Sequence, residues 1–567
     1  MQCAHKAQWN ILPPAPNEYL ATAPVPPLIG QLLYNRAIPT SKLESFLSSQ
    51  GGPEANPFLL PDVSVAVARI YRALLHREKM AVYGDFDVDG VTATALLVRA
   101  LEKLGASVSV YIPERTTEGH GLKEVGLEQL QRDGVTLVVT VDCGISDLAA
   151  ARKAAAMGLD LIITDHHIPL PDLPPASAVV NPQRDDSRYP YADFCGAGLA
   201  FKLAEALFHK DRREPWLHGM LDLVALGTVT DLVPLTDENR YLVKEGLKVL
   251  NSTSCIGLQA LISTAGLEPG KLDAASITWA LGPRLNAAGR MDSASTSYRL
   301  LTTESADEAQ GLALELEARN AERKRLADAA CSRALDRLAS RLESPLLFDA
   351  DEAYPVGVMG LVASKLEEQF YRPAIIVNLG PEFCKGSARS IPEFNLAQAL
   401  ARCQDLLSAF GGHPQAAGFT ARCEDLPRLE ERLLDIAHEQ LSGLDLRPRL
   451  TIDAEVSPSA FAGDTFSLMQ RMEPFGQRNA VPTFLSRGVE VLECHTCGER
   501  DRCLRLKLKH DGVVWQAMDY DPKSHYQTGT LLDIVYTVRK ARWNGQDVLQ
   551  FKLLDSAPSG SLSVSSR

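Results

Sequence analysis

The chain has 567 residues, of which 45% are hydrophobic and 23% are charged. These fractions are close to those of soluble globular proteins, so they argue against disordered, collagen-like and membrane-spanning classes. The length predicts three or four domains, since a domain usually holds about 100 to 200 residues. The net charge of −13 argues against a protein that coats nucleic acid through uniform positive charge, but it allows a local basic groove.

The N-terminal residues and the cysteines favour a cytoplasmic protein. Residues 1–16 contain neither a basic region followed by an apolar run nor a small-residue cleavage site, and no apolar stretch approaches about 18 residues. We therefore expect no export and no membrane insertion. The 11 cysteines are scattered without a regular spacing, so reduced thiols are the simplest interpretation.

Residues 1–78 are expected to form an N-terminal arm and a helical lead-in. Prolines between residues 13 and 27 predict an extended chain, and apolar residues at helical spacing over 31–50 predict a short helix. No chemically active motif is found in this segment.

Residues 79–304 have the pattern of an α/β domain with a parallel sheet. Short β-rich apolar runs alternate with amphipathic segments, and each helix is followed by glycine at or near its end. The expected strands are 80–83, 108–112, 136–141 and 161–164, and the expected helices are 91–104, 122–132 and 146–157.

The rest of the chain predicts a connecting helix, a smaller α/β domain and a barrel. Residues 305–343 are rich in helix formers and nearly free of turn residues, and residues 344–445 again mix both types of element. Six short β-rich runs over 446–558, with Asn544-Gly545 as a hairpin turn, predict a small β-barrel of OB-fold type. The serine-rich residues 559–567 are expected to form a mobile tail.

Acidic residues follow the predicted strands. In an open parallel sheet, ligands bind outside the carboxyl ends of the strands. The residues at these positions are Asp85, Asp87 and Asp89 after the first strand, Asp142 after the third, Asp165, His166 and His167 after the fourth, and Asp231 after a later apolar stretch. Each aspartate taken alone is explained equally well as a helix N-cap, but their coincidence favours a common site.

Converging carboxylates predict bound cations. Two carboxylates about 4 Å apart repel by about 4 kcal/mol at an effective dielectric of about 20, and a divalent ion removes this penalty. Carboxylates with imidazoles suit Mn²⁺, Mg²⁺ or iron-type octahedral sites, whereas structural zinc usually recruits thiolates. Six or more ligands exceed the need of one ion, and two ions about 3.5 to 4 Å apart catalyse phosphoryl displacement. Phosphoester hydrolysis is therefore the predicted chemistry.

These motifs resemble those of the DHH phosphoesterases. The segment 84–90, Val141-Asp142, Asp165-His166-His167 and Asp231 are similar to the successive motifs of that family, and the Asp-His-His tripeptide gives the family its name. The segments 226–235, 281–291, 385–390 and 410–418 further resemble the branch of the family that degrades single-stranded DNA. The resemblance extends from about residue 82 to residue 419 and, more loosely, through the barrel.

The resemblance implies a role for each matching residue. The implied metal ligands are Asp85, Asp87, Asp89, Asp142, His166 and Asp231, and the implied catalytic residues are Asp142, His166 and His167. His167 contacts either the metal or the substrate phosphate. Asp165 is expected to orient an imidazole without contacting the metal. For Asp85, such an orienting role is the alternative to binding the metal directly.

The resemblance also implies residues that hold the strand. These are Arg284, Asn286 and Arg290 in the first domain, and Ser387, Arg389, Ser390, Gly411, Gly412 and His413 in the second, which resembles the DHHA1 module. Glycines let backbone N–H groups approach an anion, and arginine offers a bidentate fork. The chain has Tyr354-Pro355 where the family has Trp-His, which removes one imidazole from the second domain.

Basic residues of the barrel predict a nucleic-acid surface. Side chains alternate between the two faces of a strand, so Arg505, Lys507 and Lys509 share one face of their predicted strand. A second, mainly basic group precedes the predicted hairpin turn and consists of Arg539, Lys540, Arg542 and Trp543. A solvated strand face protected by lysine is the alternative. The pair Cys494 and Cys497, with Cys503 and His510, resembles a zinc site only weakly because its second half lacks a paired spacing.

Together these features predict a cytoplasmic exodeoxyribonuclease that hydrolyses single-stranded DNA with two Mn²⁺ or Mg²⁺ ions. The resemblance implies 5′→3′ polarity, 5′-mononucleotide products, a role in recombination and repair, a monomer, and a helicase and a single-strand-binding protein as partners. One alternative is a DHH phosphatase or phosphodiesterase acting on pyrophosphate, short oligonucleotides or cyclic dinucleotides. The other is a catalytically inactive DNA-binding scaffold. The barrel argues against the first alternative, and the complete set of Asp and His residues argues against the second.

Overall fold

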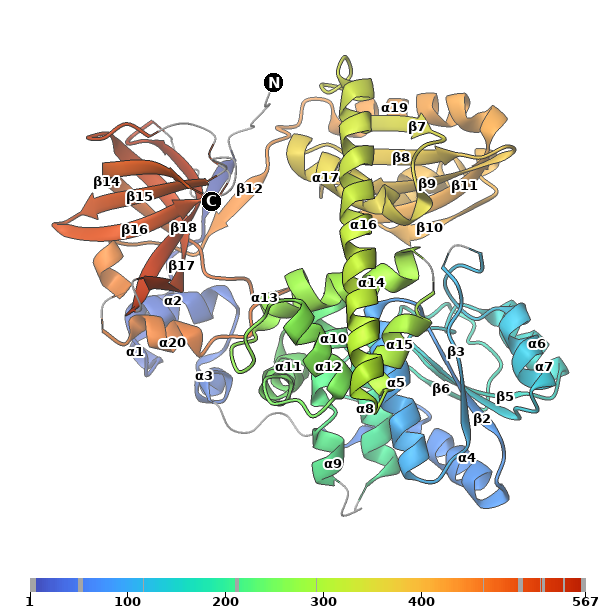
Figure 1. Ribbon diagram of the computed structural model, residues 1–567. Helices are drawn as coiled ribbons and strands as arrows, with labels where there is room; N and C mark the ends of the chain where they lie inside the picture. Colours follow the sequence, from blue (N-terminus) through green and yellow to red (C-terminus); the bar gives the residue numbers. More distant parts are fainter. Residues whose placement is uncertain are drawn as a thin grey trace.

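The computed structural model places two α/β domains around a long helix, with a β-barrel to one side (Figure 1). The described residues are 7–48, 55–115, 117–209, 214–291, 293–461, 463–497, 503–520, 522, 526–543 and 546–561. No helix within these ranges is both long and apolar enough to cross a membrane. The hairpin turn expected at Asn544-Gly545 and most of the tail expected to be mobile, residues 562–567, lie outside the described residues.

The first domain is built on a five-stranded, fully parallel sheet with the order β3-β2-β4-β5-β6. The strands are β2 (Met80–Gly84), β3 (Val108–Tyr111), β4 (Leu137–Val141), β5 (Asp160–Thr164) and β6 (Ala178–Val180). All residues of β2 and β4 are buried, because helices cover both faces of the sheet. The four predicted strands are confirmed, and β6 is an additional edge strand.

Helices cover the two faces of this sheet in separate layers. The helices concerned are α4 (Val63–His76), α5 (Val88–Lys103) and α8 (Gly196–Leu207) on one face, and α6 (Glu124–Arg132) and α7 (Leu148–Ala156) on the other. Alternate residues of β2 point to opposite faces of the sheet. Val82 packs in the core under α4, α5 and α8, and Tyr83 packs in the core under α6 and α7. The three predicted helices of this region are confirmed.

A helical extension completes the first domain. It contains α9 (Glu214–His218), α10 (Leu221–Thr230), α11 (Asp237–Leu250), α12 (Ile256–Thr264), α13 (Ala274–Ser276), one turn of π-helix η3 (Ile277–Leu281), α14 (Gly282–Met291) and α15 (Ser295–Thr302). The apolar stretch that ends at Asp231 is helix α10, so this carboxylate approaches the sheet from a helix C-terminus.

The long helix α16 (Ala306–Leu338) links the two α/β domains, as predicted. The second domain has a five-stranded sheet with the order β10-β11-β9-β8-β7, in which only β7 and β8 are parallel neighbours. Its elements are β7 (Leu347–Asp351), η4 (Val356–Val358), α17 (Met359–Phe370), β8 (Ala374–Leu379), β9 (Phe383–Arg389), α18 (Leu396–Ala401), η5 (Gln404–Leu406), β10 (Ala409–His413), β11 (Ala416–Arg422), η6 (Cys423–Asp425) and α19 (Leu426–Leu441). The edge strand β10 lies on the side that faces the first domain (Figure 1).

The C-terminal region forms a closed barrel, as predicted. Its strands are β14 (Phe484–Cys497), β15 (Cys503–His510), β16 (Val513–Asp519), β17 (Leu531–Trp543) and β18 (Gln546–Pro558). The barrel closes because β14 pairs with both β15 and β17. The elements β12 (Arg449–Ile452), β13 (Ala454–Glu455), η7 (Pro458–Phe461) and α20 (Thr465–Gln470) lead into it.

The N-terminal segment joins two different cores. Strand β1 (Gln8–Ile11) pairs in parallel with β12, and the apolar residues of α2 (Pro27–Asn35) and α3 (Leu43–Leu47) share a core with the barrel, with α1 (Asn17–Thr22) and η1 (Thr40–Lys42) beside them. In contrast, η2 (Pro57–Leu59) and α4 pack on the first domain. The helix expected over 31–50 is found as parts of α2 and α3, but the chain expected to be extended over 13–27 contains α1 and the first residue of α2. Sequence periodicity does not show which sheet a helix covers.

Cys497 and Cys503 face each other in the last residue pair of β14 and β15 and form a disulfide. The expectation that all thiols are reduced is therefore wrong for this pair. Within the described part of the chain, the Cys494 and His510 region contains no group of side chains that could hold a metal ion. The structure gives no support to the zinc site.

Candidate metal centre

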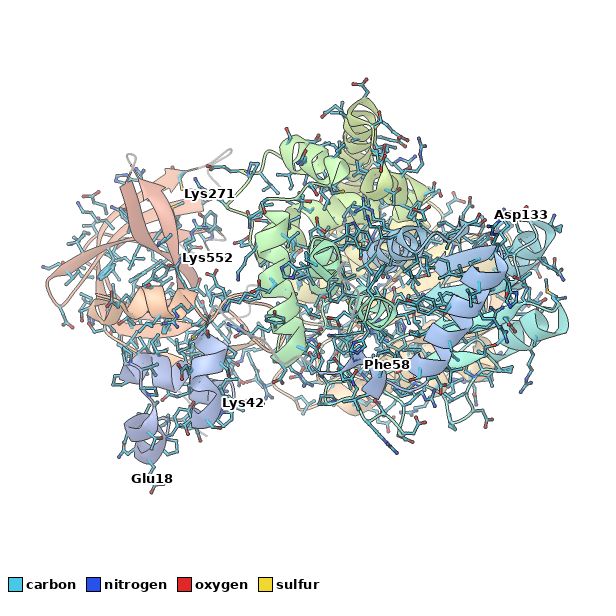
Figure 2. All side chains as sticks on the ribbon, turned by 90° about the horizontal axis from the view of Figure 1, so that it is seen from below. Glu18, Lys42, Phe58, Asp133, Lys271 and Lys552 are labelled. Carbon is cyan, nitrogen blue, oxygen red and sulfur yellow. A yellow bond between two sulfur atoms is a disulfide. The ribbon has the colours of Figure 1, made fainter. Side chains whose placement is uncertain are left out.

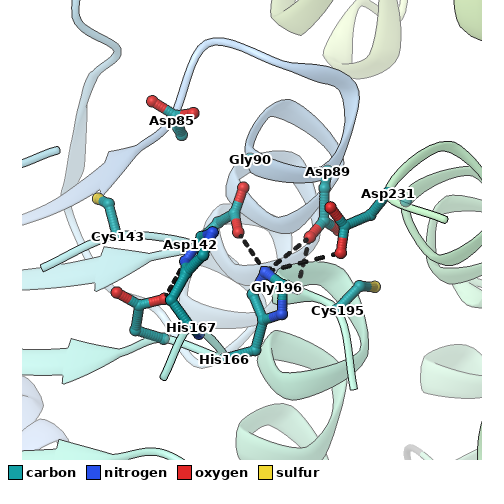
Figure 3. A network of polar contacts seen from close by, with 12 residues as sticks. Asp85, Asp89, Gly90, Asp142, Cys143, His166, His167, Cys195, Gly196 and Asp231 are labelled. Atoms are coloured by element: carbon teal, nitrogen blue, oxygen red, sulfur yellow. Dashed lines mark hydrogen bonds and ion pairs between the residues drawn. The ribbon is translucent and has the colours of Figure 1, made fainter. Parts of the chain in front are cut away.

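Six predicted ligands meet at the carboxyl edge of the first sheet. All of them except Asp87 are labelled in Figure 3. The loops after β2, β4 and β5 supply four of them, the first turn of α5 supplies Asp89, and the C-terminus of α10 supplies Asp231. The N-terminus of α8 enters the same place. A Cβ atom on Gly196 would lie 2.5 Å from the Cβ of Asp142, so only glycine allows this close approach.

The ligand atoms form three overlapping groups. Within each group, the atoms lie within 4.8 Å of one another. The groups are Asp85, Asp87 and Asp142; Asp142, His166 and His167; and Asp89, His166 and Asp231. Because Asp142 and His166 each belong to two groups, the arrangement suits two neighbouring ions with shared ligands.

His166 lies at the centre of these groups. Its Nε2 atom is 3.0 Å from Oδ1 of Asp142, 3.6 Å from Oδ2 of Asp231 and 3.9 Å from Oδ2 of Asp89. Burial is the main cause that lowers the pKa of His166, to about 4. The imidazole is therefore neutral at physiological pH, with a lone pair available for a metal.

Unpartnered atoms at the centre fit divalent cations. Oδ1 of Asp85, Nε2 of His166 and Oδ2 of Asp231 are all buried, and none of them has a hydrogen-bond partner within the part of the chain that the structure describes. Buried polar atoms normally find partners, so three unpartnered atoms in one cluster fit a site that binds a positive group. Oxygen ligands with a neutral imidazole match the preferences of Mn²⁺ and Mg²⁺.

The surrounding backbone holds the carboxylates in place. Asp89 accepts hydrogen bonds from the backbone N–H groups of Gly196 and Ala197 (2.9 Å for Ala197) at the start of α8. Asp87 caps α5 by accepting from the N–H of Gly90 at 3.1 Å. Asp142 has φ of +63°, a left-handed conformation that Asp tolerates better than most residues. The ligands are therefore positioned by the protein itself.

Crowding of the carboxylates perturbs their titration. Burial, followed by repulsion from Asp87, raises the pKa of Asp89 to about 6. Burial and neighbouring carboxylates raise the pKa of Asp142 and of Asp231 well above the usual value. A protein gains nothing in stability from such a cluster, so its presence indicates a functional site.

Asp165 contacts an imidazole and belongs to none of the three ligand groups. Its Oδ1 atom lies 2.7 Å from Nδ1 of His167, and Oδ2 accepts from the N–H of Ile145 at 2.9 Å. Burial is the largest single effect and would raise the pKa of Asp165, but the hydrogen bond and charge of His167, the charge of His166 and the N–H of Ile145 together outweigh it and lower the pKa. The carboxylate therefore stays charged and fixes the orientation of the His167 ring.

Replacing Asp165 by asparagine is expected to lower the hydrolysis rate by about 10- to 100-fold, the usual cost of losing such an orienting contact. Fold and strand binding should be unchanged. The check is kcat with Mn²⁺, beside Asp160→Asn as a matched control. Asp160 lies at the opposite end of the same strand, where it pairs with Arg69, so its loss should leave kcat within about twofold of wild type. Equal effects of the two variants would contradict the assignment.

Sequence reasoning missed two residues of the loop after β3. His120 contacts Oδ2 of Asp85 through Nδ1 at 2.9 Å, and Arg115 lies over the ring of Phe86. The hydrogen bond with Asp85 is the largest cause that raises the pKa of His120, to about 9. The carboxyl-end rule that pointed to the aspartates applies equally to this loop, so the signal was present.

Four arginines gather beside the acidic cluster, where the two α/β domains and α16 meet. They are Arg115, Arg290, Arg323 and Arg389. Burial, followed by repulsion from the other three, lowers the pKa of Arg290 to about 9. The Nε atoms of Arg290 and Arg323 are buried and have no hydrogen-bond partner among the described residues. A group of like charges with unpaired donors is a site for an anion.

The predicted strand-binding residues Asn286 and Arg284 of the first domain differ in their surroundings. Asn286 lines the cavity at the metal centre and accepts from the N–H of Val88 at 3.2 Å. Arg284 pairs with Glu317 of α16 and donates to the carbonyl of Ala280 at 2.9 Å, so its contacts are internal. The cavity has a volume of about 390 Å³ and is lined by Asp85, Phe86, Asp87, Arg115, His120, Asp142, His167, Thr230, Asp231, Asn286 and Arg290.

In the second domain, Ser387 and Arg389 lie on β9 near Gly360 at the start of α17. Ser390 is buried and donates to the carbonyl of Phe394 at 2.7 Å, which is a structural contact. Gly411, Gly412 and His413 belong to the exposed edge strand β10, so the Gly-rich segment is a strand and not a loop. Tyr354, which replaces the family tryptophan, is buried and donates to Asp349.

The basic residues of the barrel have acidic neighbours. Leu504, Leu506 and Leu508 point into the core, and the intervening Arg505, Lys507 and Lys509 point outward. Lys507 and Lys509 pair with Glu493 and Glu490 at 3.0 and 3.7 Å. Arg539 donates to Gln550 at 3.0 Å and lies over the ring of Tyr520. The side chains of Arg542 and Trp543 lie outside the described residues.

Comparison with known proteins gives a consistent result along the chain. Family models match at residues 79–228 (DHH family, N-terminal domain), 326–441 (DHHA1 domain) and 452–555 (RecJ OB domain). The single-stranded-DNA-specific exonuclease RecJ of Bacillus subtilis (strain 168) is 35% identical, over 98% of this chain and 71% of the relative. The protein of the same name in Escherichia coli (strain K12) is also 35% identical, over 94% of this chain and 92% of the relative.

Solved structures give the same result for the fold. RecJ from Thermus thermophilus in complex with Mn²⁺ superposes with a TM-score of 0.83 at 30% identity, covering 98% of this chain and 80% of the other. Its complex with Mg²⁺ has a TM-score of 0.78 at 28% identity, covering 98% and 79%. The similarity includes both α/β domains and the barrel.

Proposed function

The chain belongs to the RecJ family, and from this premise we propose that it is a single-stranded-DNA-specific exonuclease that uses two Mn²⁺ or Mg²⁺ ions. The observation that carries the proposal is the juxtaposition of two opposite clusters. Carboxylates and imidazoles that fit two cations lie beside four arginines that fit an anion. A phosphodiester of a nucleic-acid strand satisfies both clusters at once.

Each residue of the centre has a distinct part in the reaction. Asp85, Asp87, Asp89, Asp142, His166 and Asp231 would hold the ions. When bound, the ions supply a nucleophile at neutral pH and stabilise the attacking and leaving oxygens of the phosphoryl group. The His167 ring donates its Nδ1 proton to Asp165, which fixes the orientation of the ring. Nε2 of His167 is then free to contact the phosphate or an ion.

The arginine cluster supports 5′→3′ polarity. Its four members come from the first domain, α16 and the second domain, so a phosphate bound there contacts all three parts. A terminal 5′-phosphate carries more charge than an internal one and gains more from unpaired guanidinium donors. Anchoring this end beside the metal centre releases 5′-mononucleotides. The outward-facing Arg505, Lys507 and Lys509 of the barrel, with Arg539, Arg542 and Trp543, would hold the strand further along.

The test compares the hydrolysis of a 5′-phosphorylated single strand with that of a blunt duplex of the same sequence. The strand has about 20 nucleotides, because one OB-fold covers about 4 to 16 nucleotides. With Mn²⁺, the single strand should be degraded at least about 100-fold faster, with mononucleotides appearing from the 5′ end. Equal rates would refute strand specificity. Faster cleavage of dinucleotides than of the long strand would support the phosphodiesterase alternative, and lack of metal-stimulated hydrolysis would support the scaffold.

Further aspects of the proposal rest on family membership. We place the protein in the cytoplasm and in DNA recombination and repair, as a monomer that acts with a helicase and a single-strand-binding protein. The family's action on single-stranded DNA supports these partners, since a helicase produces such strands and a binding protein covers them.

A further inference from the structure

Trp279 is a large aromatic side chain that the fold leaves in solvent. It is 79% exposed, in contrast to the buried Trp9. It lies in η3, a single turn of π-helix between α13 and α14. Such turns often occur at functional sites, because their extra residue re-aims the side chains nearby. A single exposed aromatic residue is common by itself, so its position decides whether it has a function.

The helix that carries Trp279 leads to the metal centre. Elements α13, η3 and α14 follow one another without a break, and Asn286 and Arg290 of α14 line the catalytic cavity. A Cβ atom on Gly282, at the start of α14, would lie 2.6 Å from the methyl group of Thr230, another cavity residue. Trp279 and Asn286 are seven residues apart, which is about 10 Å along the helix axis.

The other end of this helix lies on the side of the barrel. In Figure 1, α13 is nearer to the barrel and α14 extends toward α16. Figure 2 shows Lys271, in the segment before α13, on the side of the first domain that faces the barrel. Asp273 of this segment and Lys540 of the barrel both lie within electrostatic reach of Glu473. The turn η3, which carries Trp279, therefore joins the end of this helix that is nearer to the barrel to the end that lines the catalytic cavity.

We propose that Trp279 is a stacking platform for a base of the bound single strand, about three nucleotides from the scissile phosphate. This inference rests on the proposed function and adds a binding site to it. The spacing follows from about 10 Å along the helix and a rise of about 3.4 Å per stacked nucleotide. Every base has an aromatic face, so such a contact holds the strand without selecting a sequence.

The first test measures strand binding without hydrolysis. Wild type, Trp279→Ala, Trp279→Phe and Leu75→Ala are titrated against a labelled, 5′-phosphorylated oligothymidylate of about 20 nucleotides in EDTA. Trp279→Ala should weaken binding about tenfold, and Trp279→Phe less than about threefold because a phenyl ring also stacks. Leu75, 83% exposed on α4, is the matched control, and its loss should leave binding unchanged. Wild-type affinity in Trp279→Ala would overturn the proposal, and this is also the result expected if Trp279 docks a protein.

The second test measures hydrolysis with Mn²⁺. Trp279→Ala should lower kcat/KM about tenfold on the long strand but leave it unchanged on a 5′-phosphorylated dinucleotide, which is too short to reach about 10 Å from the cavity. Equal losses on both substrates would overturn the stacking role. If wild type binds the strand through Trp279 but does not hydrolyse it, the stacking contact stands and the proposed exonuclease function fails.

Discussion

Replacing Asp142 by asparagine is expected to lower the rate of strand hydrolysis by at least about 10³-fold. Asp142 belongs to two of the three ligand groups and lies 3.0 Å from Nε2 of His166. Asparagine keeps the shape of the side chain but offers one neutral oxygen, so it cannot serve two ions. Metal ions typically supply several kcal/mol of charge stabilisation, and each 1.36 kcal/mol changes the rate tenfold.

The measurement is single-turnover hydrolysis of a 5′-phosphorylated strand with Mn²⁺, together with strand binding in EDTA. Binding by Asp142→Asn should stay within about threefold of wild type, because the arginine cluster and the barrel remain. Asp133→Asn is a suitable control, since this exposed residue lies before β4 and Asp142 follows the same strand. More than a tenth of wild-type activity in Asp142→Asn would show that the ions do not depend on this carboxylate.

The sequence allowed the sheet and the acidic cluster to be predicted because both depend on local patterns. Apolar runs of strand length identified β2, β3, β4 and β5, and parallel connectivity then placed Asp142 and His166 at one edge. The ligand assignments came from the family resemblance, and the three overlapping groups in the structure bring these same residues together.

Contacts that depend on tertiary packing could not be predicted in this way. Arg284 lies in a family motif, but its guanidinium is paired with Glu317 across the helix interface. The arginine cluster unites residues from sequence positions 115 to 389, and no periodicity relates them. His120 is different, because the rule that identified Asp85 also applies to the loop after β3. It was missed because that loop carries glutamates and has no aspartate motif like those after β2, β4 and β5.

Mn²⁺ is expected to stabilise the protein against unfolding, and more strongly at pH 8 than at pH 5. Without metal, the pKa of Asp89 is raised to about 6 by burial and by Asp87, whereas an unfolded aspartate titrates near 3.9. The folded state therefore keeps a proton that the unfolded state loses between about pH 4 and pH 6. The stability of the metal-free protein should fall as pH rises through this window, and bound cations should reverse the loss.

The size of the metal effect follows from mass action. At a free concentration of about 100 times Kd, each ion adds about 2.7 kcal/mol, so two independent ions add about 5 kcal/mol. Thermal unfolding in EDTA and in excess Mn²⁺, at both pH values, measures this difference. An equal Mn²⁺ effect at pH 5 and pH 8 would mean that protons do not compete with the ions for these carboxylates.

Asp231→Asn tests whether charge crowding is the cause of this pH dependence. Oδ2 of Asp231 has no hydrogen-bond partner among the residues that are described, and burial with neighbouring carboxylates raises the pKa of Asp231, so removing its charge relieves repulsion. In EDTA at pH 8 the variant should be more stable than wild type, although Mn²⁺ should stabilise it less. Asp222→Asn, on the same helix, should instead be destabilising. The two oxygens of buried Asp222 accept from the hydroxyl of Thr253 at 2.6 Å and from the N–H of Leu223 at 2.8 Å, and an amide has only one oxygen to accept with. A loss of stability in metal-free Asp231→Asn would show that this carboxylate serves the fold as well as the ions.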